Sequence, residues 1–164
     1  MNINEVHSEV VKFFPGKISD VITSGKLSFF YFDREIIYDL FLVLRDKIGM
    51  EFKHLSYIAS VDMKDHFELI YCLYSYRWGS IIHLKTRLNR EDPHIRTISD
   101  LFVAAEWHER EAYDLMGIVF NDHPDLRRIM MPDDFEGHPL RKDFVEKDNY
   151  HGIPTRRDKI LGRF

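Results

Sequence analysis

The chain has 164 residues, of which 45% are hydrophobic and 14% aromatic, which is enough for one well-packed core but hardly for two. Its 23 basic and 27 acidic side chains give a formal net charge of -4, which disfavours a freestanding binder of nucleic acid or of an anionic membrane surface. The single cysteine, Cys72, excludes a disulfide within the chain and a cysteine-ligated iron–sulfur cluster, so any role in electron transfer requires cofactors held by partners.

The amino-terminal residues lack the basic start and the apolar core of a signal peptide. The longest apolar runs, such as Leu40–Leu44, are only about five or six residues long, whereas a membrane-spanning helix needs about 20. We therefore expect a soluble chain of the cytoplasmic type that works at a membrane only if a partner holds it there.

Hydrophobic spacing in the first third of the chain predicts two helices and a hairpin. A helix is expected over residues 3–13, ended by Pro15-Gly16. Short strands are expected over 18–22 and 27–31, because the residues between them suit a hairpin connection. Asp33 is expected to cap a second helix, whose apolar positions form one stripe and which ends before a glycine.

The middle of the chain is rich in aromatic and β-branched residues. Strands are expected over 57–61, 67–76 and 81–88, and Arg77-Trp78-Gly79-Ser80 predicts that the last two form a hairpin. Residues 89–97 are expected to form a polar loop, followed by a helix that Ser99 caps and that ends near Gly117. This order predicts an α+β fold in two layers, a mixed β-sheet with helices packed on it.

Frequent prolines and glycines beyond residue 118 exclude long helices and strands. We therefore divide the chain into an α+β domain over 1–120 and, over 121–164, loops followed by an extended, irregular carboxy-terminal arm. Residues 141–164 carry a net charge of +3, whereas the preceding part is acidic. This contrast favours an arm that lies on partner subunits, but a tail that is frayed or packed on its own domain explains the composition equally well.

The most informative segment is EREAYDLMGIVFNDHPDLRRIMMPDDFEGHPLRKD, residues 109–143. It resembles the signature of the thirty-kilodalton subunit of respiratory complex I, the NADH:quinone oxidoreductase. Asp100-Leu101 and Ala104-Ala105-Glu106-Trp107 upstream are also similar to that family. The chain departs from the pattern at Val145, where the family usually has proline, and this departure concerns the path of the arm.

The resemblance implies a non-redox assembly subunit in the peripheral arm of a proton-translocating complex, at the cytoplasmic face of the inner membrane. It implies that the folded domain packs on the subunit that forms the quinone site and that the carboxy-terminal arm runs over neighbouring subunits. FMN, the iron–sulfur clusters and quinone then lie in partner subunits, and this chain carries no catalytic, cofactor-binding or metal-binding residue. Catalysis is expected only from the assembled complex.

Charged residues of this segment are the candidate interface groups. On a helix, Arg110 lies four residues from both Glu106 and Asp114 and can be held between their carboxylates, and Trp107 in the same turn is a typical interface anchor. Two basic pairs on turns can pin carboxylates of a neighbouring subunit, or equally pair with aspartates of their own chain. The predicted interface residues are Trp107, Glu109, Arg110, Glu111, Asp114, His123, Arg127, Arg128, His138, Arg141, Lys142 and Asp143.

Two other classes of function are weaker alternatives. The equivalent subunit of a membrane-bound hydrogenase or of a ferredoxin-linked complex differs only in the electron donor, which this chain does not contact. A freestanding metal hydrolase would use His123, His138 and carboxylates, but the zinc-protease spacing His-Glu-x-x-His is absent, since position 112 is alanine. The glycines form no nucleotide-binding loop.

Overall fold

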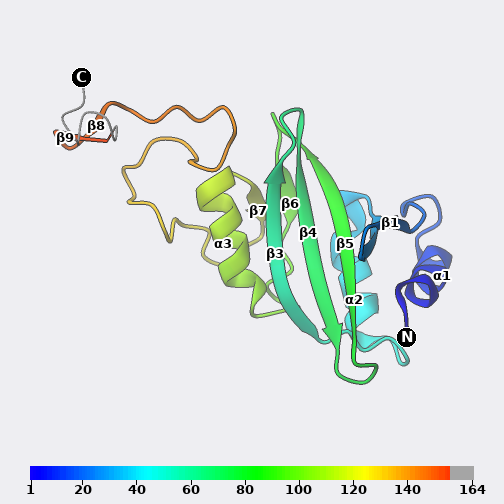
Figure 1. The fold of residues 1–164 in the computed structure, drawn as a ribbon. Helices are drawn as coiled ribbons and strands as arrows, with labels where there is room; N and C mark the ends of the chain where they lie inside the picture. The colour runs from blue at the N-terminus through cyan, green and yellow to red at the C-terminus, as the bar shows by residue number, and fades with distance from the viewer. Residues whose placement is uncertain (156–164) are drawn as a thin grey trace.

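A five-stranded mixed sheet carries the helices of this chain on one face, so the expected α+β fold is confirmed (Figure 1). The computed structural model describes residues 1–155. The sheet order is β1-β2-β5-β4-β3. Its strands are β1 (Ile22–Ser24), β2 (Leu27–Tyr31), β3 (His54–Asp62), β4 (His66–Ser75) and β5 (Ser80–Asn89).

Most strand pairings in this sheet are antiparallel. β3, β4 and β5 form a meander, and β4–β5 is the hairpin expected from the turn at 77–80. The β1–β2 hairpin is also as expected, except that its first strand covers Ile22–Ser24 rather than 18–22. Ile18 of the earlier stretch forms an isolated bridge to Phe32. β2 pairs with β5 in parallel, which makes the sheet mixed.

The core lies between the sheet and helices α1 (Ile3–Phe13), α2 (Ile37–Asp46) and α3 (Ala105–Met116). At its centre, the ring of Phe41 on α2 packs edge-on against Tyr71 of β4 at 4.9 Å between centroids. Phe41 also packs against Phe102, which precedes α3, at 6.2 Å. α2 and α3 therefore cover the same face of the sheet, and the opposite face carries no helix within residues 1–155.

Of the two expected amino-terminal caps, one is confirmed in part, because the N-cap residue of α2 itself, Ile36, makes no side-chain hydrogen bond, and the other is not found. Asn2 and Glu5 form a reciprocal capping box at α1, and Asp33 caps a single 3-10 turn that leads into α2. The expected cap at Ser99 is wrong, because α3 begins at Ala105 and its N-cap residue, Ala104, makes no side-chain hydrogen bond. Residues 99–104 consist mainly of turns instead.

Two three-residue strands flank α3 in sequence. β6 (His94–Arg96) pairs in parallel with β7 (Val119–Asn121), so residues 89–97 are not wholly a polar loop as expected. Their central residues, Ile95 and Phe120, are buried in the core. The pairing fixes both ends of α3 relative to one another.

Residues 122–155 leave the body of the protein with little regular structure. The strands β8 (Asn149–Tyr150) and β9 (Ile153–Pro154) form a short hairpin near the end of the described chain. Figure 1 shows this arm extending away from α3 and from the sheet. The predicted course of residues 156–164 lies outside the described residues. Within residues 1–155, no helix has the length and apolar character needed to cross a membrane.

Candidate functional site

The carboxy-terminal turn of α3 is covered by the segment that follows it. Backbone carbonyls at the end of a helix have no partner inside the helix. Here, the carbonyl oxygen of Asp114 accepts from Nδ1 of His138 at 2.9 Å, and that of Leu115 accepts from the amide of Leu140 at 3.1 Å. The carbonyl oxygen of Met116 accepts from Nε of Arg141 at 2.7 Å. We call residues 114–117 together with 128–143 the arm junction.

Electrostatics also favour this arrangement, because the carboxy-terminal end of a helix carries a partial negative charge that attracts cations. The guanidinium groups of Arg128 and Arg141 both reach carbonyl oxygens of the last turn, those of Asp114 and Met116 respectively. Burial lowers the pKa of His138, which favours a neutral imidazole that donates from Nδ1 alone. The two arginines therefore supply the positive charge at this helix end.

Gly117 leaves room for the arm at the point of closest approach. It ends α3 in the left-handed conformation, with φ of 71°, which favours glycine. A Cβ atom at this position would lie 2.5 Å from Nε2 of His138 and against Nη2 of Arg141. Glycine is thus needed here both for the backbone turn and for the packing of two arm side chains.

Asp114 organises the start of the arm from inside the protein. Its side chain is fully buried, and one carboxylate oxygen accepts from the amides of Ile129, Met130 and Met131 at 3.1, 2.7 and 2.9 Å. The other oxygen pairs with Arg128 at 2.8 Å. Burial alone would raise the pKa of Asp114, but the three amides and Arg128 hold it below its ordinary value. The carboxylate therefore stays ionised and fixes the backbone of residues 129–131.

A second buried aspartate holds the far end of the junction. Asp62, the last residue of β3, accepts from the amide of Lys142 at 2.8 Å and pairs with Arg90 at 2.5 Å. Arg90 also pairs with Asp143 at 2.5 Å, so it links the sheet to the arm. Burial acts to raise the pKa of Asp62, yet these donors lower it to about 2.

An aromatic ring supports the two arginines at this end of the junction. The guanidinium groups of Arg90 and Arg141 lie 5.0 and 5.1 Å from the centre of the Phe67 ring. Cations at this distance from an aromatic face are attracted by the negative charge of the ring's π system. Phe67 of β4 therefore helps to hold the arm against the end of the sheet.

Glu109 lies on the buried side of α3 and has a different environment. Its carboxylate accepts from Oγ1 of Thr97 and from the amide of Ile98, the latter at 2.9 Å. Nε2 of His123 lies 3.9 Å away, but that nitrogen is already 3.1 Å from the carbonyl oxygen of Glu106, to which it donates. Burial raises the pKa of Glu109 to about 7, because the two hydrogen bonds do not fully replace the lost solvation.

The outer side of α3 exposes Trp107 next to an arginine, Arg110, that is itself buried. Trp107 is 62% exposed, and the guanidinium of Arg110 stacks on its ring at 4.9 Å. Arg110 also donates to the carbonyl oxygen of Arg127 at 3.2 Å and lies 3.8 Å from Asp125. The side chain of Arg127 is 72% exposed. An aromatic residue with neighbouring arginines is typical of the centre of protein–protein interfaces.

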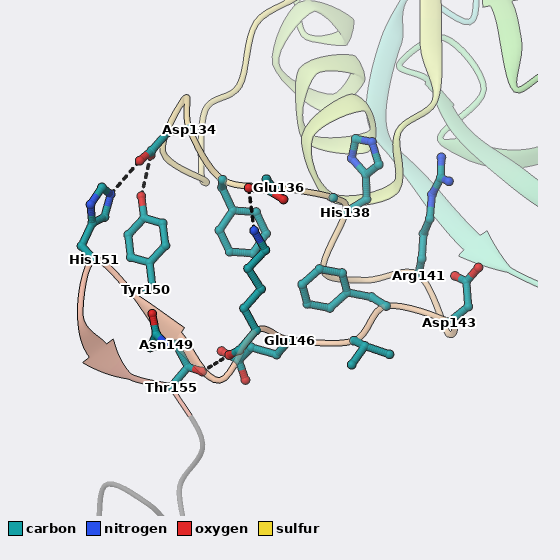
Figure 2. A pocket seen from close by; sticks show the side chains of 15 residues that line it. Asp134, Glu136, His138, Arg141, Asp143, Glu146, Asn149, Tyr150, His151 and Thr155 are labelled. Atoms are coloured by element: carbon teal, nitrogen blue, oxygen red, sulfur yellow. Dashed lines mark hydrogen bonds and ion pairs between the residues drawn. The ribbon is translucent and has the colours of Figure 1, made fainter.

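A cavity of about 660 Å³ lies between the arm and the junction (Figure 2). Asp134 accepts from the hydroxyl of Tyr150 at 2.5 Å, and its other oxygen lies 2.6 Å from Nε2 of His151. Figure 2 shows these contacts at the outer end of the cavity. Phe135 and Phe144 stack at 5.9 Å and form its apolar wall. The arm thus folds back on itself beyond the junction.

The sequence of residues 30–158 matches the family described as the respiratory-chain NADH dehydrogenase 30 Kd subunit. The chain belongs to this family. It is 39% identical over 121 residues to an NADH-quinone oxidoreductase subunit of Salinispora arenicola and 40% identical over 139 residues to NADH-ubiquinone oxidoreductase subunit 9 of Reclinomonas americana. The matches cover 71% and 82% of this chain, but 49% and 67% of those proteins. The chain thus spans about half the length of the first relative.

A dehydrogenase subunit of another kind and two solved structures are also similar to this chain. An F(420)H(2) dehydrogenase subunit of Methanosarcina mazei is 39% identical over 93 residues, which cover 56% of this chain and 59% of that protein. A solved trypsin-resistant fragment of Nqo5 superposes with a TM-score of 0.60 at 30% identity, covering 77% of this chain and 100% of the fragment. A chain of an archaeal membrane-bound sulfane sulfur reductase shares the fold, with a TM-score of 0.73 at 24% identity over 87% of this chain and 85% of that chain.

Half of the predicted interface residues lie at the arm junction. Of the predicted site residues, the structure brings Asp114, Arg128, His138 and Arg141 together at the end of α3. Lys142 and Asp143 join them through Asp62 and Arg90. The remaining predicted residues lie outside the junction, on α3 or at the turn that follows it: Trp107, Glu109, Arg110, Glu111, His123 and Arg127.

One local prediction about the signature is wrong. Arg110 is not held between Glu106 and Asp114, because Asp114 points to Arg128 and the amides after it, while Arg110 turns to Trp107 and Arg127. The basic pairs do form contacts within their own chain. Arg127 pairs with Asp125 and Arg128 with Asp114, as the alternative of aspartates in the same chain predicts, whereas Arg141 donates to backbone carbonyls.

Several residues that hold the arm junction from the sheet were not predicted. Asp62, Arg90 and Phe67 lie in or next to the sheet, far from the signature in sequence, and nothing in their spacing indicates that they meet the arm. The same holds for Thr97, the partner of Glu109. Among residues 1–155, no group of three or more His, Cys, Asp and Glu side chains is arranged to hold a metal ion.

Proposed function

We propose that this chain is a non-redox assembly subunit of the peripheral arm of a proton-translocating NADH:quinone oxidoreductase, catalytic only within the complex. FMN, the iron–sulfur clusters and quinone are then bound by partner subunits, at the cytoplasmic face of the membrane. Membership of the 30 Kd subunit family and relatives named as NADH-quinone oxidoreductase subunits support this proposal.

The observation that carries the proposal is the arm junction. Buried aspartates and the end of α3 fix residues 128–143, so the chain that follows starts from a defined place and direction. An arm oriented in this way suits a subunit that binds to neighbours along an extended surface, because less conformational entropy is lost when a pre-oriented segment docks. We assign docking on the quinone-site subunit to this arm together with the exposed side chains of Trp107 and Arg127.

Co-purification from membranes tests the proposal. A tagged full-length chain should recover the quinone-site subunit together with the flavin and iron–sulfur subunits, whereas a chain that ends after Phe144 should recover much less of them. The matched control is Asp20→Asn, which changes a charge on an exposed residue remote from the arm. Full recovery of the quinone-site subunit by the shortened chain would contradict the role of the arm.

Spectroscopy of the isolated chain tests the proposal that this subunit carries no redox cofactor of its own. The purified protein should show no visible absorbance from flavin or cluster and should not reduce a quinone analogue with NADH. Reduction of quinone by the isolated chain would contradict the proposal.

A second candidate is the equivalent subunit of a complex that takes electrons from another donor, such as a membrane-bound hydrogenase or a ferredoxin-linked complex. The similarity to an F(420)H(2) dehydrogenase subunit favours keeping this candidate. The identity of the electron-input subunit recovered in the same co-purification distinguishes the two.

A further inference from the structure

The open face of the sheet carries a row of apolar side chains that no helix of residues 1–155 covers. In an antiparallel sheet with one solvated face, that face is expected to be polar. β5 follows this rule with His83, Lys85 and Arg87. On β3, however, Tyr57, Ala59 and Val61 face the same side, and Tyr57 and Val61 are exposed.

Strand register places further apolar residues of β4 beside this row. Tyr57 pairs with Cys72, which is buried, and Ala59 pairs with Ile70, so the patch is two strands wide at these residues. Val61 pairs with Glu68, so beyond Ala59 the apolar surface is carried by β3 alone. Met63, just beyond β3, is exposed and extends the patch past Val61. Large exposed apolar patches on otherwise soluble domains commonly mark sites of protein binding.

The border of the patch is positively charged. In the β4–β5 register, Ile70 pairs with Lys85, and Glu68 pairs with Arg87. Glu68 brings a negative charge to these strand pairs, but its carboxylate already accepts a hydrogen bond from Tyr31 at 2.6 Å and pairs with Lys85 at 3.2 Å. The Arg87 side chain, in contrast, is 60% exposed and lies 3.6 Å from Glu68. The patch therefore has an apolar floor on β3 and part of β4, and a cationic edge on β5 at which Arg87 is the exposed charge and Lys85 is largely buried.

We propose that this face binds one amphipathic helix of a partner protein, with its apolar stripe on β3 and β4 and acidic side chains over Arg87. Two strands are about 10 Å wide, which is the diameter of one helix with its side chains. The stretch from Tyr57 to Met63 spans about 20 Å, which corresponds to about 13 helical residues. A helix of about four turns thus fits the length of the β3 row, and its diameter fits the two-strand width at Tyr57 and Ala59.

Charge argues against two other occupants. The segment 156–164 contains Arg156, Arg157, Lys159 and Arg163 against one acid, Asp158, so it would bring like charge to the cationic edge. A second copy of the chain, packed face to face, would bring its own cationic edge near the first. A helix of a different protein with acidic side chains on one flank would bring the opposite charge to the cationic edge and would not be repelled.

Site-specific crosslinking in the assembled membrane complex tests the proposal. A photo-reactive amino acid at Val61 should form adducts that map to one helix of another protein, with apolar residues three or four apart and Asp or Glu beside them. The same amino acid at Lys12, on α1 and hence on the other side of the sheet, is the control and should not label that helix. Adducts with a second copy, with residues 156–164 or with a non-helical segment, or no adduct at all, would overturn the proposal.

A charge variant supplies a second readout. Arg87→Glu should reduce co-purification of the labelled protein at least about fivefold, and Arg87→Gln about twofold, whereas Lys12→Glu should leave it unchanged. Because Arg87→Glu places a second carboxylate beside Glu68, the thermal melt of each variant is measured first, and Arg87→Gln provides the test if Arg87→Glu unfolds. Undiminished recovery with a folded Arg87 variant would overturn the proposal. This face does not include the arm junction, so the result is independent of how the arm binds the quinone-site subunit.

Discussion

Arg141 donates from Nε to the carbonyl oxygen of Met116 at 2.7 Å, and in doing so joins the arm to the last turn of a helix 25 residues earlier in the chain. The same guanidinium has no carboxylate partner among the ion pairs of residues 1–155 and instead meets backbone oxygens and the ring of Phe67. Its charge is therefore balanced by the partial negative charge of the helix end. This bond therefore ties the arm to α3 without any carboxylate paired to Arg141.

Arg141→Ala should destabilise the protein by about 1–2 kcal/mol, because a partly buried charge-assisted hydrogen bond is lost and a helix carbonyl is left without its donor. Urea unfolding measures the change in free energy. Hydrogen exchange should also become faster at residues 138–143 with little change in the sheet. Arg127→Ala, at an exposed arginine, is the control and should change stability by less than about 0.5 kcal/mol. Equal effects of the two substitutions would argue against the junction.

Asp114→Asn should cost about 3 kcal/mol or more. The amide side chain removes the charge that pairs with Arg128 and offers one oxygen, rather than two, to Arg128 and the three amides of residues 129–131. Chemical denaturation gives the free energy of unfolding, and limited proteolysis reports release of the segment after α3. Asp133→Asn, at an exposed aspartate in the arm, should be nearly neutral. A neutral result for Asp114→Asn would show that these amides find other acceptors.

Gly117→Ala and Gly25→Ala form a matched pair at glycines of similar positive φ, 71° and 62°. Both should lose about 1 kcal/mol from backbone strain. Only Gly117→Ala adds a clash, with His138 and Arg141, because nothing lies within 4 Å of a Cβ at Gly25. We expect Gly117→Ala to be the more destabilising by thermal denaturation and to change the amide spectrum of residues 138–141. Identical melting temperatures of the two variants would mean that the side chains of His138 and Arg141 move aside without a loss of stability.

The raised pKa of Glu109 predicts a pH dependence of a definite sign. With a folded-state pKa of about 7 and an ordinary value of 4.5, the folded protein holds a proton between these pH values that the unfolded chain has released. Stability should therefore fall as pH rises from about 5 to about 8, by on the order of 3 kcal/mol from this group. Glu109→Gln should remove that slope, and unfolding curves at both ends of this pH range test it. Parallel slopes for the two proteins would contradict the assignment.

The elements that followed from the sequence are those formed by neighbours in the chain. The β4–β5 hairpin joins two long strands through a short turn, and the helix over 3–13 carries its own capping box. β6 and β7 were not predicted, because each has only three residues and the two strands that pair are separated in the sequence by α3. Short strands gain their stability from such distant pairing, which local patterns do not reveal.

The signature residues show the same limit at the level of side chains. Spacing of four on a helix predicted a contact between Arg110 and Asp114, but such a pair on an exposed helix surface contributes only a few tenths of a kcal/mol. Hydrogen bonds from three backbone amides and the pair with Arg128 stabilise the buried carboxylate of Asp114 by more than a surface pair with Arg110 would. Asp114 therefore makes these tertiary contacts instead. The identities of the charged residues were thus informative, but their partners required the fold.

The two buried aspartates, Asp114 and Asp62, hold the arm mainly by its main chain: four of their donors are the amides of residues 129, 130, 131 and 142. A backbone amide is the same in every residue except proline, which lacks the proton. These four contacts are therefore independent of the side chains at their own positions, whereas Arg128, His138 and Arg141 fix the segment through their side chains. A substitution at any of these four positions, other than by proline, leaves its amide able to bind the buried aspartate, so the side chain there can suit a neighbour without removing this anchor of the arm.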